Sequence, residues 1–189
     1  MLFDSGNLLQ TVSGNVKRHR AARKWSQQEL ADRSKVSRGM IAKIESGEEN
    51  VSLATLGRIA LAFGISFTDV VSDASPEAAG AAGSPAHRLQ VWQGNRPDTR
   101  VALLGSFVGQ RMTDLFEWTL APGDRYAGEP DLQDTRELVY VVKGSLRLEH
   151  GGEARTLRAG DALVFPSDQP CCFVNPGRGQ LRFILAVVG

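Results

Sequence analysis

The sequence predicts a two-domain protein in which a bundle of short helices precedes a β-sandwich or barrel. Three observations predict this class. Up to about residue 73, capping residues precede short segments with apolar residues at helical spacing. Residues 74–87 have the Ala, Gly, Ser and Pro composition of a linker. From residue 88 to 189, apolar and polar residues alternate in short segments separated by turn residues, as in strands.

Five short helices are expected in the domain at residues 1–73. The first is expected over residues 7–24. Serine occupies the expected N-cap of each of the other four: Ser26, Ser37, Ser52 and Ser66. Glu29 and Asp69 follow two of these serines by three residues and complete capping boxes. Gly47 and Gly64 stand where a left-handed residue would end a helix.

The helix that begins after Ser37 has one apolar face and one polar face. Ile41 and Ile44 are three residues apart and share the apolar face. The opposite face carries small and basic residues, namely Ser37, Arg38, Gly39 and Lys43. Arginine can bind guanine through two hydrogen bonds in the DNA major groove, and small residues allow close approach. This face therefore indicates DNA binding, with a solvated helix face as the alternative.

Charge is concentrated in the same region. The net charge of the chain is only +1, but residues 15–43 contain nine Lys and Arg against two acidic residues. Residues 88–189 contain twelve of each sign. The imbalance predicts a polyanionic partner for the first domain alone. Lys17 and Arg20, late in the first helix, are expected to contact phosphates.

Residues 13–73 resemble the phage-repressor-like, or XRE, helix-turn-helix family. The resemblance rests on SQQELADRS, VSRGMIAKIESGEENVSLATLGRIALAFGIS and FTDVV. It implies a five-helix bundle whose third helix reads double-stranded DNA through Ser37, Arg38, Gly39 and Lys43. Gln27 matches a phosphate-contacting position of the family. Lys35 departs from it, because many members have glycine in this turn; a left-handed lysine would cost about 1 kcal/mol.

Nine strand candidates follow the linker: LQVWQ, RVALLG, DLFEWTLA, ELVYVVKG, SLRLEH, ARTLRAG, DALVFP, CCFVN and QLRFILAVV. This half resembles the cupins. The resemblance rests on Pro122-Gly123, Glu129-Pro130-Asp131, Glu137 and Gly144, and on AGDALVFPSDQPCCFVN. It implies a double-stranded β-helix, a barrel of the jelly-roll type.

The cupin metal site is largely replaced in this sequence. Metal-binding cupins place His, His, Glu and His where this chain has Glu129, Asp131, Glu137 and Cys171, so only the glutamate is kept. Three interpretations are open: an altered site for a metal such as zinc, an acidic pocket for an organic cation, or a single interior Glu137 with the others on a solvated loop.

We adopt the acidic pocket, with an amine, amino acid or short peptide as effector. Arg125 is a candidate partner for an effector carboxylate, and Tyr140 completes the expected effector-binding set. Neither a cofactor nor catalytic residues are expected, since no nucleophile has a matching base. Cys171 and Cys172 are adjacent and expected to be free thiols.

The functional hypothesis is a ligand-responsive transcriptional regulator, with repression as the expected output. It would act as a homodimer held by the barrel, because one reading helix contacts few base pairs. With no signal peptide or long apolar run in the sequence, we expect a cytoplasmic protein without membrane contact. Two alternatives are a metal-dependent cupin enzyme fused to a DNA-binding domain, and a regulator whose barrel only dimerises.

Overall fold

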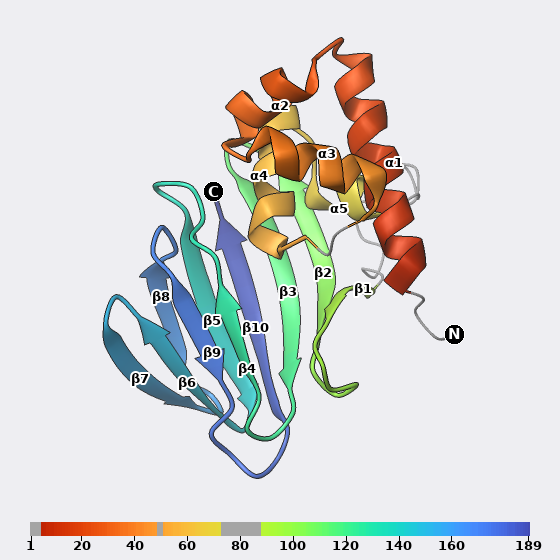
Figure 1. The fold of residues 1–189 in the computed structure, drawn as a ribbon. Helices are drawn as coiled ribbons and strands as arrows, with labels where there is room; N and C mark the ends of the chain where they lie inside the picture. Colours follow the sequence, from red (N-terminus) through yellow and green to blue (C-terminus); the bar gives the residue numbers. More distant parts are fainter. Residues whose placement is uncertain (1–4, 49–50, 73–87) are drawn as a thin grey trace. The chain divides into compact units, whose positions relative to one another are not determined.

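The computed structural model describes residues 5–48, 51–72 and 88–189 (Figure 1). The chain divides into two compact units, Met1–His87 and Arg88–Gly189. The first unit is helical and the second is built of strands, which confirms the predicted fold class. The expected linker at residues 74–87 lies outside the described part of the chain.

The helical unit contains the five expected helices: α1 (Ser5–Ala22), α2 (Gln27–Ser34), α3 (Arg38–Ser46), α4 (Leu53–Phe63) and α5 (Phe67–Val71). All four predicted serine caps are confirmed, because each hydroxyl accepts a hydrogen bond from the backbone N–H three residues on. Gly47 and Gly64 end α3 and α4 in the left-handed conformation.

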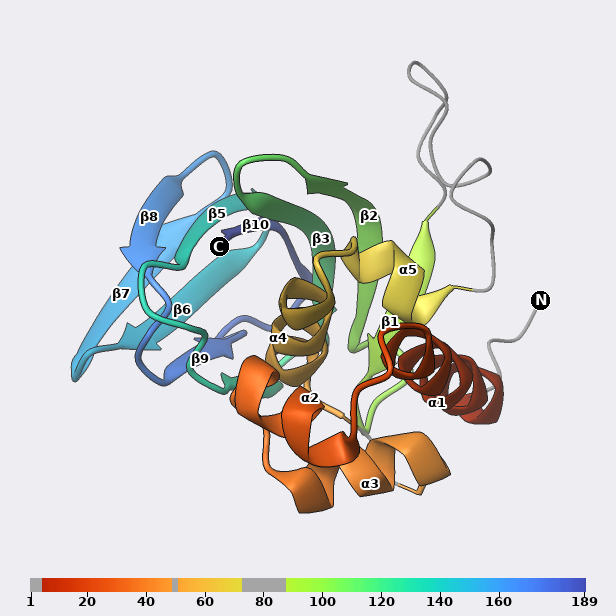
Figure 2. The ribbon, with the colours of Figure 1, turned by 90° about the horizontal axis from the view of Figure 1, so that it is seen from above.

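A short turn joins α2 to α3 (Figure 2). Lys35 lies in this turn and adopts the left-handed conformation. Its φ of 57° allows its N–H to donate to the carbonyl of Ala31. The first helix ends earlier than expected, at Ala22, and Lys24 also has a positive φ, of 56°.

A single apolar core holds the helical unit together. Val16, Leu30, Ile41 and Ile59 are completely buried in it. The buried amide of Asn15 ties α1 to the end of α5 by donating to the carbonyl of Val70 at 3.0 Å. None of the described helices is both long enough and apolar enough to cross a membrane.

The second unit contains ten strands: β1 (Leu89–Gln93), β2 (Arg100–Val108), β3 (Met112–Leu120), β4 (Arg125–Gly128), β5 (Arg136–Lys143), β6 (Ser145–His150), β7 (Glu153–Arg158), β8 (Ala162–Pro166), β9 (Cys171–Val174) and β10 (Leu181–Val188). Nine of them correspond to the predicted segments; β4 was not predicted. The strands form a six-stranded sheet in the order β1-β2-β3-β10-β5-β8 and a four-stranded sheet in the order β4-β9-β6-β7 (Figure 1).

Aromatic rings from both sheets fill the space between them. Trp118 of β3 stacks on Phe183 of β10, with ring centroids 5.7 Å apart. Phe173 of β9, in the smaller sheet, contacts Phe183 at 5.2 Å. Leu146 and Leu148 of β6 are also buried, whereas Arg147 between them is exposed, as the alternation predicted. Side chains on the inner faces of the two sheets therefore meet in one core, and those on the outer faces point away from it.

Candidate nucleic-acid interface and barrel site

The first turn of α3 presents an exposed polar surface. The Ser37 hydroxyl accepts from the N–H of Met40 at 3.2 Å and so fixes where the helix begins. Arg38, Gly39 and Lys43 are exposed, while Ile41 and Ile44 are buried on the other side of the helix. The position of a Cβ on Gly39 has no neighbouring atom within 4 Å, which leaves open space beside the helix. This arrangement suits a helix that enters the major groove.

Arg20 and Gln27 are instead engaged inside the helical unit. Arg20 of α1 binds the carboxylate of Glu45 on α3 through two hydrogen bonds, of 2.6 and 2.9 Å. Its third donor reaches the carbonyl of Trp25 at 2.8 Å. Gln27 of α2 donates to the same Glu45 carboxylate at 2.9 Å. The donors of Arg20 therefore join α1 to α3 and to the loop before α2, and the phosphate contact of Arg20 stays a prediction.

The surroundings of Glu45 agree with this structural role. Only 4% of its side chain is exposed. Burial alone would raise the pKa of Glu45, but hydrogen bonds from Arg20 and Gln27 and the charges of Arg20 and Lys17 lower it overall. The hydrogen bond to Glu45 uses one N–H of the Gln27 amide. The contact of Gln27 with a phosphate stays a prediction. Lys17 is exposed and stays a candidate phosphate contact.

Two carboxyl groups lie inside the barrel in one cross-strand row. Asp114 of β3 and Glu137 of β5 are both paired with Val187 of β10, which places them on the inner face two strands apart. Burial raises the pKa of Asp114 to about 6, against a hydrogen bond from Ser106. Burial, with the charge of Asp131, raises the pKa of Glu137 to about 8. One oxygen of Glu137, Oε2, is buried without a hydrogen-bond partner.

The remaining predicted acidic residues lie close to Glu137. Asp131 is half-buried in the loop after β4, where its N–H donates to the carbonyl of Ser167 at 2.8 Å. Glu129 in the same loop is exposed, but its charge contributes to a raised pKa of Tyr126, which is caused mainly by burial. Burial, followed by the charges of Glu137 and Asp131, raises the pKa of the Cys171 thiol to about 12.

Arg125 and Tyr140 lie on outer faces and do not join this cluster. Arg125 is exposed and donates to the Cys172 thiol at 3.2 Å. Tyr140 is 44% exposed on β5, three residues from Glu137. Because successive side chains alternate between faces, Glu137 and Tyr140 cannot both point into the barrel. The prediction that these two residues contact an interior effector is corrected.

The donors present do not fit a metal centre. Across the described ranges, no three His, Cys, Asp or Glu residues are placed to hold a metal ion together. Both cysteines are buried free thiols.

His150 was not among the predicted site residues, yet it faces the interior. His150 follows Leu148 by two residues on β6, as Leu148 follows Leu146, so all three side chains point to the same face; Leu146 and Leu148 are buried. This two-residue spacing can be read from the sequence. The ring of His150 lies 5.2 Å from that of Phe165 on β8, and its Nε2 is buried without a hydrogen-bond partner. Phe165 in turn pairs with Glu137, so His150 lies near the acidic row.

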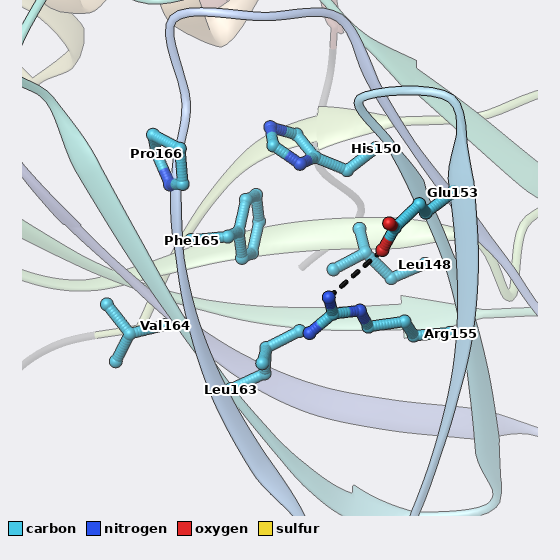
Figure 3. A pocket seen from close by; sticks show the side chains of 8 residues that line it. All are labelled: Leu148, His150, Glu153, Arg155, Leu163, Val164, Phe165 and Pro166. Atoms are coloured by element: carbon cyan, nitrogen blue, oxygen red, sulfur yellow. Dashed lines mark hydrogen bonds and ion pairs between the residues drawn. The ribbon is translucent and has the colours of Figure 1, made fainter.

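A pocket of about 210 Å³ opens beside His150. It lies between β6 and β7 of one sheet and β8 of the other, and Figure 3 shows the side chains around it. Leu148, Leu163 and Phe165 provide apolar walls. Glu153 and Arg155 are joined by an ion pair of 3.0 Å on the β7 side. The pocket thus combines apolar walls with polar groups of both signs and adjoins the buried acidic row at Phe165.

Comparisons with known proteins match both units. The family model described as a helix-turn-helix matches residues 16–70, and the one described as a cupin domain matches residues 116–188. The HTH-type transcriptional regulator SutR of Escherichia coli (strain K12) is 28% identical over 177 residues, which cover 94% of either chain. The crystal structure of an HTH_3 family transcriptional regulator from Vibrio cholerae is 21% identical, with a TM-score of 0.75 over 98% of this chain and 99% of that one. At 21% identity, the likeness to the Vibrio cholerae structure supports the fold alone.

Proposed function

We propose that this chain, a transcriptional regulator that joins an XRE-type helix-turn-helix domain to a cupin domain, is a homodimer that represses transcription in the cytoplasm in response to a small organic amine. An amino acid or a short peptide with a free amino group belongs to the same class. The helical unit binds the operator, and the barrel binds the effector.

The exposed first turn of α3 supports the DNA-binding role. Arg38 and Lys43 are exposed on α3, whereas Ile41 and Ile44 are buried. Arg38 is the base-reading residue in this proposal, because a guanidinium can bind the O6 and N7 atoms of guanine together. Two such helices, in half-sites about 34 Å apart, would read a symmetric operator.

The single observation that carries the sensing role is the buried Glu137 oxygen without a partner. With a pKa of about 8, an empty site holds this group mostly protonated at neutral pH. An ammonium group beside it would favour the carboxylate and satisfy the orphaned oxygen. Asp131 and Asp114 add negative charge nearby, while Leu148, Leu163 and Phe165 offer apolar contacts.

A sensing role, rather than catalysis, is proposed for the barrel. The groups around Glu137 are acids with raised pKa values, and no basic residue contributes to the shift of Glu137, Asp114 or Cys171. If a metal copurified stoichiometrically and were lost in Glu137→Gln, the alternative of a cupin enzyme would be favoured instead.

Thermal unfolding of the full chain tests the sensing role. The amines are putrescine, lysine and a dipeptide, and acetate serves as the ligand without an amino group. An amine at 100 times its dissociation constant would add about 2.7 kcal/mol of stability. We expect this stabilisation in the wild type and in the control Asp98→Asn, which removes an exposed carboxylate from the β1–β2 turn. Glu137→Gln should abolish it. No stabilisation by any amine, or equal stabilisation of Glu137→Gln, would contradict the sensing role.

Coupling between the two units is tested by DNA binding with and without the amine that stabilises the protein. An effector acts only if it binds one arrangement of the dimer better than the other. The expected change in operator affinity is about 5- to 150-fold. An unchanged affinity at saturating amine would leave the alternative of a barrel that only dimerises.

A further inference from the structure

Two groups of opposite charge lie on opposite sheets of the barrel. Glu137 is on the inner face of β5 in the six-stranded sheet, where its buried Oε2 has no hydrogen-bond partner. Arg155 is on β7 of the four-stranded sheet and pairs in register with Leu148 of β6. Residues paired in this way point to the same face, and Leu148 is buried, so Arg155 also points to the inner face. Each group is therefore on the side of its own sheet that faces the other sheet.

Arg155 reaches the pocket of about 210 Å³ beside His150. Among the described residues that line this pocket, it is the only Arg or Lys, and Figure 3 shows its side chain and the ring of His150 at different sides of the pocket. A guanidinium has five N–H donors, and the ion-pair partner of Arg155, Glu153, is 70% exposed. An ion pair this exposed contributes little stability. A ligand carboxylate can therefore bind Arg155 beside Glu153 or in its place.

A simple amine leaves a buried group of the barrel unsatisfied. The Nε2 of His150 and the Oγ of Ser167 are buried without a hydrogen-bond partner, as is the Oε2 of Glu137. Ser167 is only 2% exposed, and it lies two residues after Phe165, which pairs with Glu137. An imidazole and a hydroxyl can accept from an ammonium group, but the hydroxyl hydrogen itself needs an acceptor, which an alkyl ammonium lacks. A ligand that satisfies all three groups therefore needs an acceptor as well as an amino group.

The size of the pocket favours a small molecule. Its volume of about 210 Å³ is below the about 300–1,000 Å³ of pockets that hold drug-sized ligands. Two packed sheets lie about 10 Å apart, and the long side chain of Arg155 covers part of that distance. A molecule with a few carbon atoms between its charged groups can therefore contact both sheets. Leu148, Leu163 and Phe165 would pack against those carbon atoms.

Arg155 and Glu137 are both available to a ligand. The charge of Arg155 does not contribute to the raised pKa of Glu137, so the two side chains do not neutralise each other. We infer that the effector is a single free amino acid: Glu137 binds its amino group and Arg155 binds its carboxylate, with His150 and Ser167 as further hydrogen-bonding partners. This inference rests on the proposed function, which places the amino group at Glu137. It adds the carboxylate, so that a diamine such as putrescine binds more weakly than an amino acid.

Amino acids, compared with the amines that they give on loss of the carboxyl group, test this inference. The pairs are lysine with cadaverine, leucine with 3-methylbutylamine, and alanine with ethylamine. Each compound is titrated into the full chain by calorimetry. In the wild type, at least one amino acid should bind about 10- to 100-fold more tightly than its amine, which is the effect of hydrogen bonds between charged groups.

Arg147 provides a matched control for Arg155. Both are exposed arginines of the four-stranded sheet, and each forms an ion pair with a glutamate two residues away, at 3.1 Å for Arg147 and 3.0 Å for Arg155. Arg147 stands between the buried Leu146 and Leu148 on β6 and so points to the outer face. Arg147→Gln should keep the affinity ratio between amino acid and amine, whereas Arg155→Gln should reduce it to about one. Circular dichroism checks that each variant is folded, and the wild-type ratio needs no variant.

The outcomes separate this inference from the proposed function. Equal binding of amino acid and amine in every pair, or an unchanged ratio in folded Arg155→Gln, would overturn the inference. Amine binding that Glu137→Gln abolishes would then leave the proposed function standing. If none of the six compounds binds, both the inference and the sensing role fail.

Discussion

Replacing Glu137 by glutamine should remove a pH dependence of stability that the buried carboxyl creates. Glutamine has nearly the same shape but does not ionise. Glu137 has an ordinary pKa of 4.5 and a folded-state pKa of about 8, caused mainly by burial. Since the folded-state value is the higher one, the folded protein holds a proton that the unfolded chain releases. The unfolding free energy therefore falls as pH rises from 4.5 to about 8.

The fall is large enough to measure. Two-state proton linkage with these two pKa values gives a decrease of about 2 kcal/mol between pH 6 and pH 8. Asp114, whose folded-state pKa is about 6, contributes with the same sign, but mainly below pH 6. Cys171 contributes mainly above pH 9, because its pKa is raised from 9.0 to about 12. The interval from pH 6 to pH 8 therefore reports chiefly on Glu137.

Urea unfolding followed by tryptophan fluorescence measures this effect in the barrel. The chain has three tryptophans. Trp25, which stacks on Phe63 in the helical unit, is replaced by phenylalanine in both proteins, so the signal comes from Trp92 and Trp118. The replacement also removes the helical unit, which contains His19, from the fluorescence signal. Burial lowers the pKa of His19, so this residue makes the unfolding free energy rise with pH, opposite to Glu137.

At one protein concentration, the Trp25→Phe protein should lose about 2 kcal/mol of barrel stability between pH 6 and pH 8, and the Glu137→Gln variant should lose little. The variant should then be the more stable protein at pH 8. Parallel curves for the two proteins would refute the buried, protonated Glu137 on which the sensing role depends.

Three further changes separate the roles assigned within the helical unit. Arg38→Ala should cost about 1–3 kcal/mol of operator binding and reduce the preference over random duplex, measured by competition binding; an unchanged preference would exclude it as a base reader. Lys17→Ala should weaken binding to all duplexes alike and reduce the salt slope by about one, whereas a sequence-selective loss would contradict a phosphate contact. Arg20→Ala should instead destabilise the helical unit by about 3 kcal/mol, because it leaves the buried carboxylate of Glu45 without its cation; urea unfolding followed by helical circular dichroism measures this, and unchanged stability would contradict the structural role.

Local sequence signals determined the helical unit well. Each serine cap acts on a backbone N–H three residues away, so the helix starts could be read directly from the sequence. The pairing of Arg20 with Glu45 could not, because 25 residues separate them and only the packing of α1 against α3 brings them together. A cluster of basic residues therefore predicted a DNA contact for a side chain that the fold itself uses.

The barrel site was predictable only in part. Alternation in β5 places Glu137, Val139 and Val141 inside, and the same rule would have excluded Tyr140. His150 could have been found in the same way, from its spacing to Leu148.

Two features of the barrel gave weaker signals. The strand β4, Arg125–Gly128, was missed because it is four residues long and has only one large apolar side chain, Tyr126. The pocket beside β7 and β8 depends on the approach of two sheet edges, which single-strand patterns do not specify.

Selection of bound duplexes from a random library, with the full chain and at two salt concentrations, tests most directly that this chain reads DNA through α3. The account predicts enrichment of an inverted repeat whose half-sites lie about 10 base pairs, or a multiple of this distance, apart. It also predicts an affinity that falls steeply with salt. Recovery of unenriched sequences, or of the same repeat with equal strength by Arg38→Ala, would contradict it.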